Sequence, residues 1–152
     1  MKQLKISAIQ NGTVIDHITC GMALKVLHIL GLDEGQVNQT VSIIMHVPSR
    51  AHTFKDIVKI EDRELKKSEV NRIALLSPHA TINIIRDGEV ADKHHVRPPR
   101  DVLGLVQCEN PNCITNTREP VETRFKVLRK EPMVLKCAYC GREQEVDVER
   151  LE

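Results

Sequence analysis

Cys108-Glu-Asn-Pro-Asn-Cys113 begins the segment on which the fold of the second half of this chain depends, and Cys137-Ala-Tyr-Cys140 ends it. The cysteines are spaced C-x4-C and C-x2-C, with 23 residues between the two pairs. Two such pairs, each on a turn, form knuckles that present four thiolates to one tetrahedral zinc ion. All seven histidines precede residue 96, so only cysteines are available as ligands in the second half. We therefore expect one structural zinc ion per chain, bound by Cys108, Cys113, Cys137 and Cys140.

Two disulfides are the alternative interpretation of this spacing. The odd cysteine count of five and the absence of a secretory signal after Met1 disfavour it, because disulfides persist mainly in oxidising compartments. Four thiolate ligands leave the metal no open coordination position, so a structural role is expected rather than a catalytic one. Cys20 stands apart from the others and is expected to be a small buried hydrophobic residue.

The composition is that of an ordinary globular protein with little capacity for nucleic-acid binding. Its 152 residues carry 22 basic and 21 acidic side chains, whereas phosphate binding requires clustered, uncompensated cations. Only 2% of the residues are aromatic, which disfavours a base-stacking surface. No apolar run has the length of a membrane span. We expect a soluble cytoplasmic protein that binds neither nucleic acid nor a membrane.

Two adjacent prolines, Pro98 and Pro99, separate two parts of different composition. Histidines occur only before them, and four of the five cysteines occur only after them. Because proline continues neither a helix nor a sheet ladder, we expect a domain boundary here, with domains spanning 1–97 and 98–152. Paired prolines also make a connection semi-rigid, which favours transmission of rigid-body motion between the domains.

The first domain combines helix and strand patterns in an α+β arrangement. Met22, Val26 and Leu30 recur at helical spacing, and Asp87-Gly88 is a strong hairpin signal. Helices are expected over 22–30 and 68–76. Strands are expected over 4–9, 13–18, 39–47, 54–60, 80–86 and 89–93. The order β-α-β-β-α-β is that of the ferredoxin-like fold, the split βαβ plan.

The second domain is predicted to be a small antiparallel-β zinc domain. Strands are expected over 102–106, 123–128, 133–135 and 145–148. About fifty residues with two aromatic side chains bury too little apolar area to fold dependably alone. The predicted zinc ion would supply the missing stabilisation.

No catalytic motif is evident in the sequence. The P-loop, dinucleotide-binding, zinc-protease and nucleophile-elbow patterns are all absent. Asp16-His17 is the most reactive-looking pair, but neighbours in a strand point to opposite faces of a sheet and would not act together. We therefore expect a protein without catalytic activity. The alternative is an enzyme that uses Asp16 and His17.

Four segments, taken in order, resemble a known family. They are Gly12-Thr13-Val14-Ile15-Asp16-His17-Ile18, Lys55-Asp56-Ile57-Val58-Lys59-Ile60-Glu61, Pro78-His79-Ala80-Thr81-Ile82-Asn83 and Leu135-Lys136-Cys137-Ala138-Tyr139-Cys140. Together with the cysteine spacing, this series closely resembles the regulatory chains of aspartate carbamoyltransferase (aspartate transcarbamoylase). The resemblance covers essentially the whole chain, from Leu4 to about Val148.

This resemblance implies a non-catalytic allosteric regulatory subunit of an enzyme complex in de novo pyrimidine biosynthesis. Its N-terminal domain would bind the effectors CTP and ATP, with UTP as a further candidate, and would pair with a second regulatory chain as a homodimer. Its zinc domain would contact the catalytic chain. Two catalytic trimers and three regulatory dimers would then form a dodecamer.

The same resemblance implies a nucleotide-binding site in the first domain. Asp16 would accept hydrogen bonds from ribose hydroxyls, and His17 would meet a phosphate. Lys93 would reach the triphosphate, and Lys59 would reach the ribose and base. The remaining positions would line the ribose and base, and they are Ala8, Ile9, Val14, Asn83, Ile85 and Val90.

Two positions depart from the family pattern. Ser7 replaces an acidic residue and Gly88 an aromatic one, which leaves the preference between CTP and ATP open. Two other classes of protein also stay open as alternatives, a zinc-ribbon nucleic-acid module and a ferredoxin-like sensor without an enzyme partner. The second domain carries 9 basic and 10 acidic residues, and this net charge of −1 disfavours the nucleic-acid module.

Overall fold

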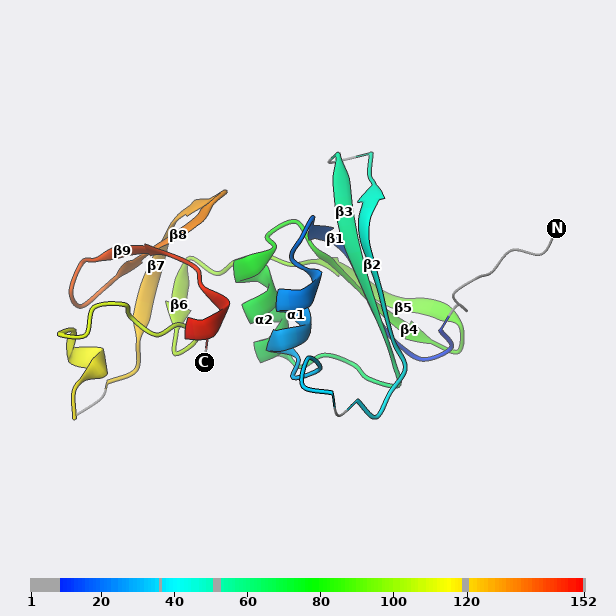
Figure 1. Cartoon of the computed structure of the whole chain (residues 1–152), viewed down its shortest axis with the longest axis horizontal. Helices are drawn as coiled ribbons and strands as arrows, with labels where there is room; N and C mark the ends of the chain where they lie inside the picture. The colour runs from blue at the N-terminus through cyan, green and yellow to red at the C-terminus, as the bar shows by residue number, and fades with distance from the viewer. Residues whose placement is uncertain (1–8, 36, 51–52, 119–120, 152) are drawn as a thin grey trace.

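The computed structural model describes residues 9–35, 37–50, 53–118 and 121–151. Two antiparallel sheets lie at opposite ends of the molecule, with two helices between them (Figure 1). The fold class is therefore α+β, as predicted. No helix in these ranges is long and apolar enough to cross a membrane.

The first sheet has the strand order β2-β3-β1-β4-β5, and each neighbouring pair is antiparallel. Because β3 lies between β1 and β2, the β1-α1-β2 unit is a split βαβ, and the predicted ferredoxin-like plan is confirmed. A hairpin from β4 adds β5 as a fifth strand. The elements are β1 (Gly12–Thr19), α1 (Ala23–Ile29), β2 (Val41–Pro48), β3 (Phe54–Glu61), α2 (Lys67–Leu76), β4 (Thr81–Arg86) and β5 (Glu89–His95).

Both helices pack on the same face of this sheet (Figure 1). Alternate residues of its central strands, such as Ile15, Val58 and Ile82, are fully buried against the helices. Leu27 and Ile73 supply the helical side of this first core. Because strand residues alternate between faces, the intervening side chains of β1, β3 and β4 point to the opposite face, called the open face below.

The second sheet has the strand order β6-β7-β8-β9 and packs around its own core. Phe125, Val102 and Leu135 are fully buried there. Leu75, on α2, is 1% exposed and belongs to this second core rather than the first, so α2 joins the two halves. The elements are β6 (Asp101–Leu103), β7 (Arg124–Lys130), β8 (Met133–Cys137) and β9 (Glu143–Glu145), with short 3-10 turns η1 (Ile114–Asn116) and η2 (Val148–Arg150).

The connection between the sheets is held at both of its ends. β5 continues to His95, and Val96 is buried in the first core. On the other side, the carbonyl of Arg100 accepts a hydrogen bond of 3.0 Å from the N–H of Val127 on β7. Only a few residues around Pro98 and Pro99 therefore remain to move between the two sheets.

Two strands of the second domain differ from the predicted bounds. The strand predicted over 102–106 ends at Leu103, because Gly104 adopts φ 68° and its N–H donates to the Thr123 carbonyl at 2.8 Å. A positive φ removes a residue from the extended backbone that a ladder requires. The prediction of a continuous strand through 106 is thus wrong.

The strand predicted over 145–148 is also wrong in its bounds. β9 ends at Glu145, and a 3-10 turn begins at Val148. The carboxylate of Asp147 accepts a hydrogen bond of 3.0 Å from the N–H of Glu149 and so caps this turn. Local hydrogen bonding by Asp competes with the strand ladder, which explains why the strand ends early.

Gly12 starts β1 with φ 145°, a conformation that favours glycine. A Cβ atom here would lie 2.1 Å from the carbonyl oxygen of Ile60, on the adjacent strand β3. We expect Gly12→Ala to lower the free energy of unfolding by about 2 kcal/mol or more, measured by thermal denaturation. Gly31→Ala, at φ 72° with open space around its Cβ position, is the control and should cost about 1 kcal/mol. Equal losses would contradict the steric argument.

Candidate functional site

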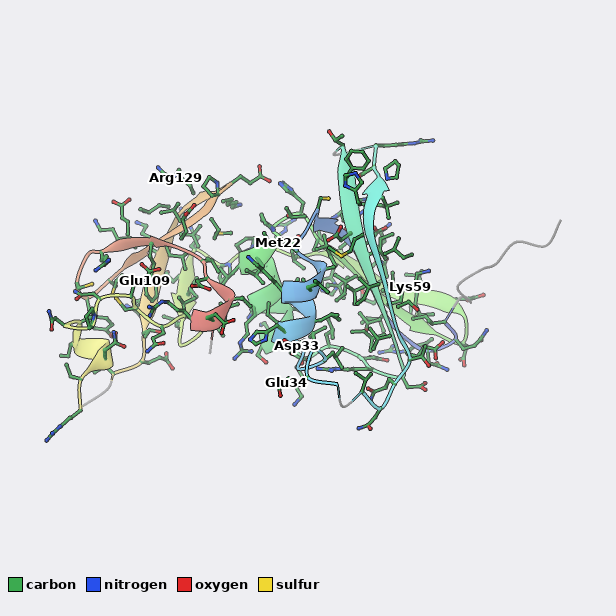
Figure 2. The ribbon with its side chains drawn as sticks, viewed as in Figure 1. Met22, Asp33, Glu34, Lys59, Glu109 and Arg129 are labelled. Carbon is green, nitrogen blue, oxygen red and sulfur yellow. The ribbon has the colours of Figure 1, made fainter. Side chains whose placement is uncertain are left out.

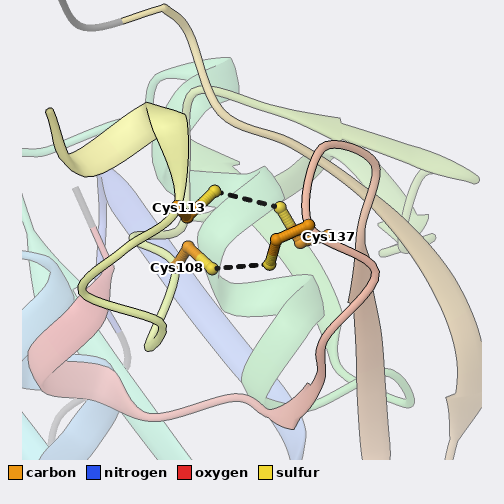
Figure 3. A group of neighbouring side chains, drawn as sticks. Cys108, Cys113 and Cys137 are labelled. Carbon is orange, nitrogen blue, oxygen red and sulfur yellow. Dashed lines mark hydrogen bonds between the residues drawn. The ribbon is translucent and has the colours of Figure 1, made fainter.

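Four cysteine sulfurs converge where β8 ends at Cys137 (Figure 3). The sulfurs of Cys108 and Cys140 are 3.7 Å apart, as are those of Cys113 and Cys137, and all four lie within 4.8 Å of one another. A tetrahedral zinc–thiolate site with Zn–S bonds of about 2.3 Å has edges of about 3.8 Å. A disulfide would need about 2.05 Å between sulfurs. The predicted ligand set is therefore brought together in a geometry that fits a structural metal ion.

Turns and side chains hold the two knuckles in place. The N–H of Cys113 donates to the Asn110 carbonyl at 3.0 Å, and the N–H of Gly141 donates to the Cys137 carbonyl at 2.9 Å. The amide nitrogen of Asn116 donates to the carbonyls of Cys108 and Asn110, at 3.0 and 2.8 Å. Asn116 thus fixes the first knuckle from η1, a role that no sequence motif predicts.

The environment divides the four thiols into two kinds. A hydrogen bond from the N–H of Arg142 lowers the pKa of Cys140 to about 7. Burial opposes ionisation of Cys113, but hydrogen bonds from Thr115 lower its pKa. Burial raises the pKa of Cys108 to about 12 and also raises that of Cys137. One ligand of each pair is therefore favoured as a thiolate, and a bound cation would supply the attraction that ionises the other.

Cys20 lies outside this cluster, and its predicted burial is wrong. The side chain is exposed, and its sulfur lies 3.4 Å from Nδ1 of His46. The His46 ring in turn stacks on Phe54, with centroids 3.8 Å apart. Cys20 lies in the turn after β1. A turn residue does not follow the strand's alternation of buried and exposed side chains, so the apolar pattern does not predict its exposure.

The open face of the first sheet collects most of the residues predicted to bind a nucleotide. Val14 on β1 lies opposite both Lys59 on β3 and Asn83 on β4, and Asn83 lies opposite Lys93 on β5. Residues opposite one another in a ladder point to the same face. Lys59, Val14, Asn83 and Lys93 therefore form one row across four strands, called the polar row below, with Lys59 on the side away from the helices (Figure 2).

Two further predicted residues join this face beside the polar row. Ile85 lies opposite Val90, whereas Asn83 lies opposite Lys93. Val90 and Lys93 are an odd number of residues apart and would face opposite sides of a regular strand. A register shift between Ile84 and Ile85 corrects this and places both side chains on the open face.

Asp16 and His17 stand next to the polar row at an irregularity in β1. The register of β1 against β3 shifts between Ile15 and Ile18, and His17 adopts φ 55°. Nδ1 of His17 lies 3.9 Å from the Asp16 carboxylate, so the prediction that the two neighbours point apart is wrong. The bulge turns the His17 ring back toward the face that carries Asp16.

Lys55 also belongs to this face, although it is not among the residues predicted from sequence. Its Nζ lies 2.9 Å from the Asp16 carboxylate. Partial burial of Asp16 opposes ionisation, but the Lys55 and His17 hydrogen bonds more than offset it and lower the pKa of the carboxyl. Lys55 precedes Lys59 by four residues on β3, so strand alternation puts both on one face and could have found it.

The first residues of the predicted site are only partly within the described structure. Ala8, Ser7 and all but the last residue of the strand predicted over 4–9 lie outside it. Ile9 is buried but belongs to no strand. The backbone carbonyl of the next residue, Gln10, accepts a hydrogen bond of 2.8 Å from the N–H of Gly88, so this segment runs beside the β4–β5 hairpin.

These features define an α+β protein that carries a structural metal site. Residues 4–97 match the family model described as "Aspartate carbamoyltransferase regulatory chain, allosteric domain", and residues 100–149 match the corresponding "metal binding domain". The chain belongs to the family of aspartate carbamoyltransferase regulatory chains. It is a non-catalytic subunit with an allosteric and a metal-binding domain, as the resemblance implied.

Named relatives agree with this assignment. An "Aspartate carbamoyltransferase regulatory chain" of Thermofilum pendens is 55% identical over 138 residues, which are 90% of this chain and 86% of the relative. A protein of the same name from Methanocella arvoryzae is 54% identical over 140 residues, 91% of this chain and 89% of the relative. Another from Thermoplasma volcanium is 51% identical over 141 residues, 93% and 92% of the two chains.

Proposed function

We propose that this chain binds CTP and ATP on the open face of its first sheet and relays their binding to the catalytic chain through a zinc domain. The observation that carries the proposal is the polar row, which aligns Lys59, Val14, Asn83 and Lys93 across four strands. UTP is a further candidate effector. The allosteric domain would span 1–97 and the zinc domain 98–152.

The polar row offers the separate groups that a nucleoside triphosphate requires. Lys93 is exposed on the edge strand β5, where a flexible ammonium group can follow phosphate oxygens. Asn83 donates to the Val14 carbonyl at 3.2 Å, which leaves its amide oxygen to accept from a ribose or a base. Lys59, half-buried on β3, places a second cation at the opposite end of the polar row from Lys93.

The Asp16–Lys55 ion pair reduces the electrostatic repulsion between this face and a bound phosphate. An unpaired carboxylate would repel a triphosphate, but Lys55 at 2.9 Å neutralises Asp16. The oxygens of Asp16 can still accept hydrogen bonds from ribose hydroxyls. His17 would then meet a phosphate beside this pair.

In this proposal the four-cysteine cluster holds one zinc ion and shapes the surface that contacts the catalytic chain. Thiolate ligands and the 3.7 Å sulfur separations suit zinc. The regulatory chains would pair as homodimers, and three such dimers would join two catalytic trimers in a cytoplasmic dodecamer. Sedimentation of the mixed subunits would give the stoichiometry.

Lys93→Ala is expected to weaken CTP and ATP binding together, because it removes a phosphate contact that both nucleotides share. A lost charged hydrogen bond costs about 1.5–3 kcal/mol, or about ten- to a hundredfold in affinity. Isothermal titration calorimetry on the full chain would measure both nucleotides. Lys67→Ala, which removes an exposed cation on α2, is the matched control and should leave both affinities unchanged. Unaltered binding in the Lys93 variant would exclude that residue from the site.

A further inference from the structure

We propose that a cationic groove on the second sheet docks an acidic segment of the catalytic chain. This rests on the proposed function, which makes the catalytic chain the partner of the zinc domain. The groove has a volume of about 480 Å³ and lies over β6, β7 and β8. Its lining includes Arg124, Lys126, Lys136 and Tyr139, with Asp101 at one side.

The strand register concentrates positive charge at the centre of this groove. Lys126 on β7 lies directly opposite Lys136 on β8, and Arg124 precedes Lys126 by two residues on the same face. Like charges directly opposite one another destabilise a sheet. Asp101 and Glu143 lie opposite these lysines on the outer strands, but the contact between the two lysines stays unfavourable, and an anion bound over them would relieve it.

These cations lack internal partners in the described parts of the chain. Ion pairs within 4.0 Å occupy Lys55, Arg63 and Arg86, but none includes Arg124 or the two groove lysines. All three groove cations are exposed, so their charges are available to a partner. An arginine fork and two ammonium groups match the carboxylates of Asp and Glu side chains.

Tyr139 adds an apolar anchor to this charged surface. The chain has only three aromatic residues of the Phe, Tyr and Trp types, and Tyr139 is 50% exposed. Tyr and Arg are the residue types most enriched among those that dominate protein–protein binding energy. Tyr139 lies between the ligands Cys137 and Cys140, so a bound metal would hold its backbone rigid and lower the entropy cost of docking.

A short acidic protein segment suits the groove better than a nucleic acid. Asp101 lies opposite Lys126 on one side, and Glu143 lies opposite Lys136 on the other. Carboxylates at both ends of this row would repel the phosphates of a long polyanion that crossed it. A few carboxylates placed over the central cations avoid that repulsion.

Lys126→Glu separates docking from folding. The new carboxylate would face Lys136 favourably and Asp101 unfavourably, so the two cross-strand effects largely offset each other and the variant should fold and retain its metal. Its affinity for the catalytic subunit from the same organism should fall about tenfold or more, and its affinity should depend less on salt. Titration of the full regulatory chain into catalytic trimer at two salt concentrations would measure both effects.

Lys67→Glu makes the same change in net charge on the exposed surface of α2 and should bind like the unaltered chain. Equal binding by the Lys126 variant would overturn the groove assignment while leaving the proposed function intact. Failure of the unaltered chain to bind catalytic trimer would overturn the proposed function and the groove with it. If Lys126→Glu instead reduces only binding of a single-stranded oligonucleotide, the groove is a nucleic-acid site and the proposal is wrong.

Discussion

Replacing Cys137 by serine is expected to unfold the second half of this protein and to release it from the catalytic chain. Cys137 ends β8, is almost fully buried in the second core, and supplies one of four converging thiolates. In small metal domains the binding free energy of zinc is folding free energy, about 10 kcal/mol or more at neutral pH. Zinc content and near-ultraviolet circular dichroism of the full chain would record the loss.

Cys20→Ser provides the matched control, because it removes an exposed thiol outside the cluster. That variant should keep one zinc ion and full stability. A chelator or a mercurial should reproduce the Cys137 phenotype in the unaltered chain, and acidification should do the same by protonating the thiolates. Folded, reduced protein without any metal would contradict the structural role of the cluster.

Local spacing explains why the metal ligands could be predicted from sequence and their supports could not. Each knuckle is encoded within a few residues, so C-x4-C and C-x2-C suffice to name Cys108, Cys113, Cys137 and Cys140. Asn116 contacts the first knuckle through two backbone carbonyls, which are common to all residues. A hydrogen bond to backbone carbonyls requires no particular sequence motif, so the role of Asn116 is visible only in the folded loop.

Strand alternation predicts the open face of the first sheet only where the strands are regular. Asn83, Lys59 and Val14 follow that alternation, and their alignment depends on register, which hydrophobic pattern sets. The bulges near His17 and between Ile84 and Ile85 have no sequence signature of comparable strength. They bring His17 to Asp16 and Val90 to the polar row, so these placements come from tertiary structure alone.

The structure offers a second route of communication besides the semi-rigid connection that the sequence predicts. Pro98 and Pro99 favour a semi-rigid connection that could transmit motion. Direct packing between the two halves would transmit motion without it. Leu75, on α2, inserts into the second core while Ile73, two residues earlier, packs in the first. A single helix thus contributes to both cores, which couples their movements by direct packing.

Leu75→Ala is therefore expected to uncouple the two halves. Removing a buried leucine costs about 2–5 kcal/mol, and here the cavity opens in the second core, where α2 of the first half packs against the second half. In the reconstituted complex the coupling free energy between CTP and aspartate should fall by about 0.5–2 kcal/mol, a large share of a typical 1–3 kcal/mol. CTP affinity of the free regulatory chain should stay near its original value, because Leu75 lies outside the polar row. Aspartate saturation curves with and without CTP, together with calorimetry, measure both quantities.

Two comparisons decide between packing and connection. Ile73→Ala removes a side chain of equal volume from the same helix but from the first core, so a similar loss of stability should leave more of the CTP response intact. A Gly-Ser replacement of residues 97–99 should also preserve most of the response, because Val96 and Arg100 still anchor the two ends of the connection. If the Gly-Ser variant loses the response and Leu75→Ala keeps it, transmission runs through the prolines. If Leu75→Ala loses the response and the Gly-Ser variant keeps it, transmission runs through the packing of α2 in the second core. Such packing can transmit the effect of CTP only if its contacts differ between the quaternary states of the complex.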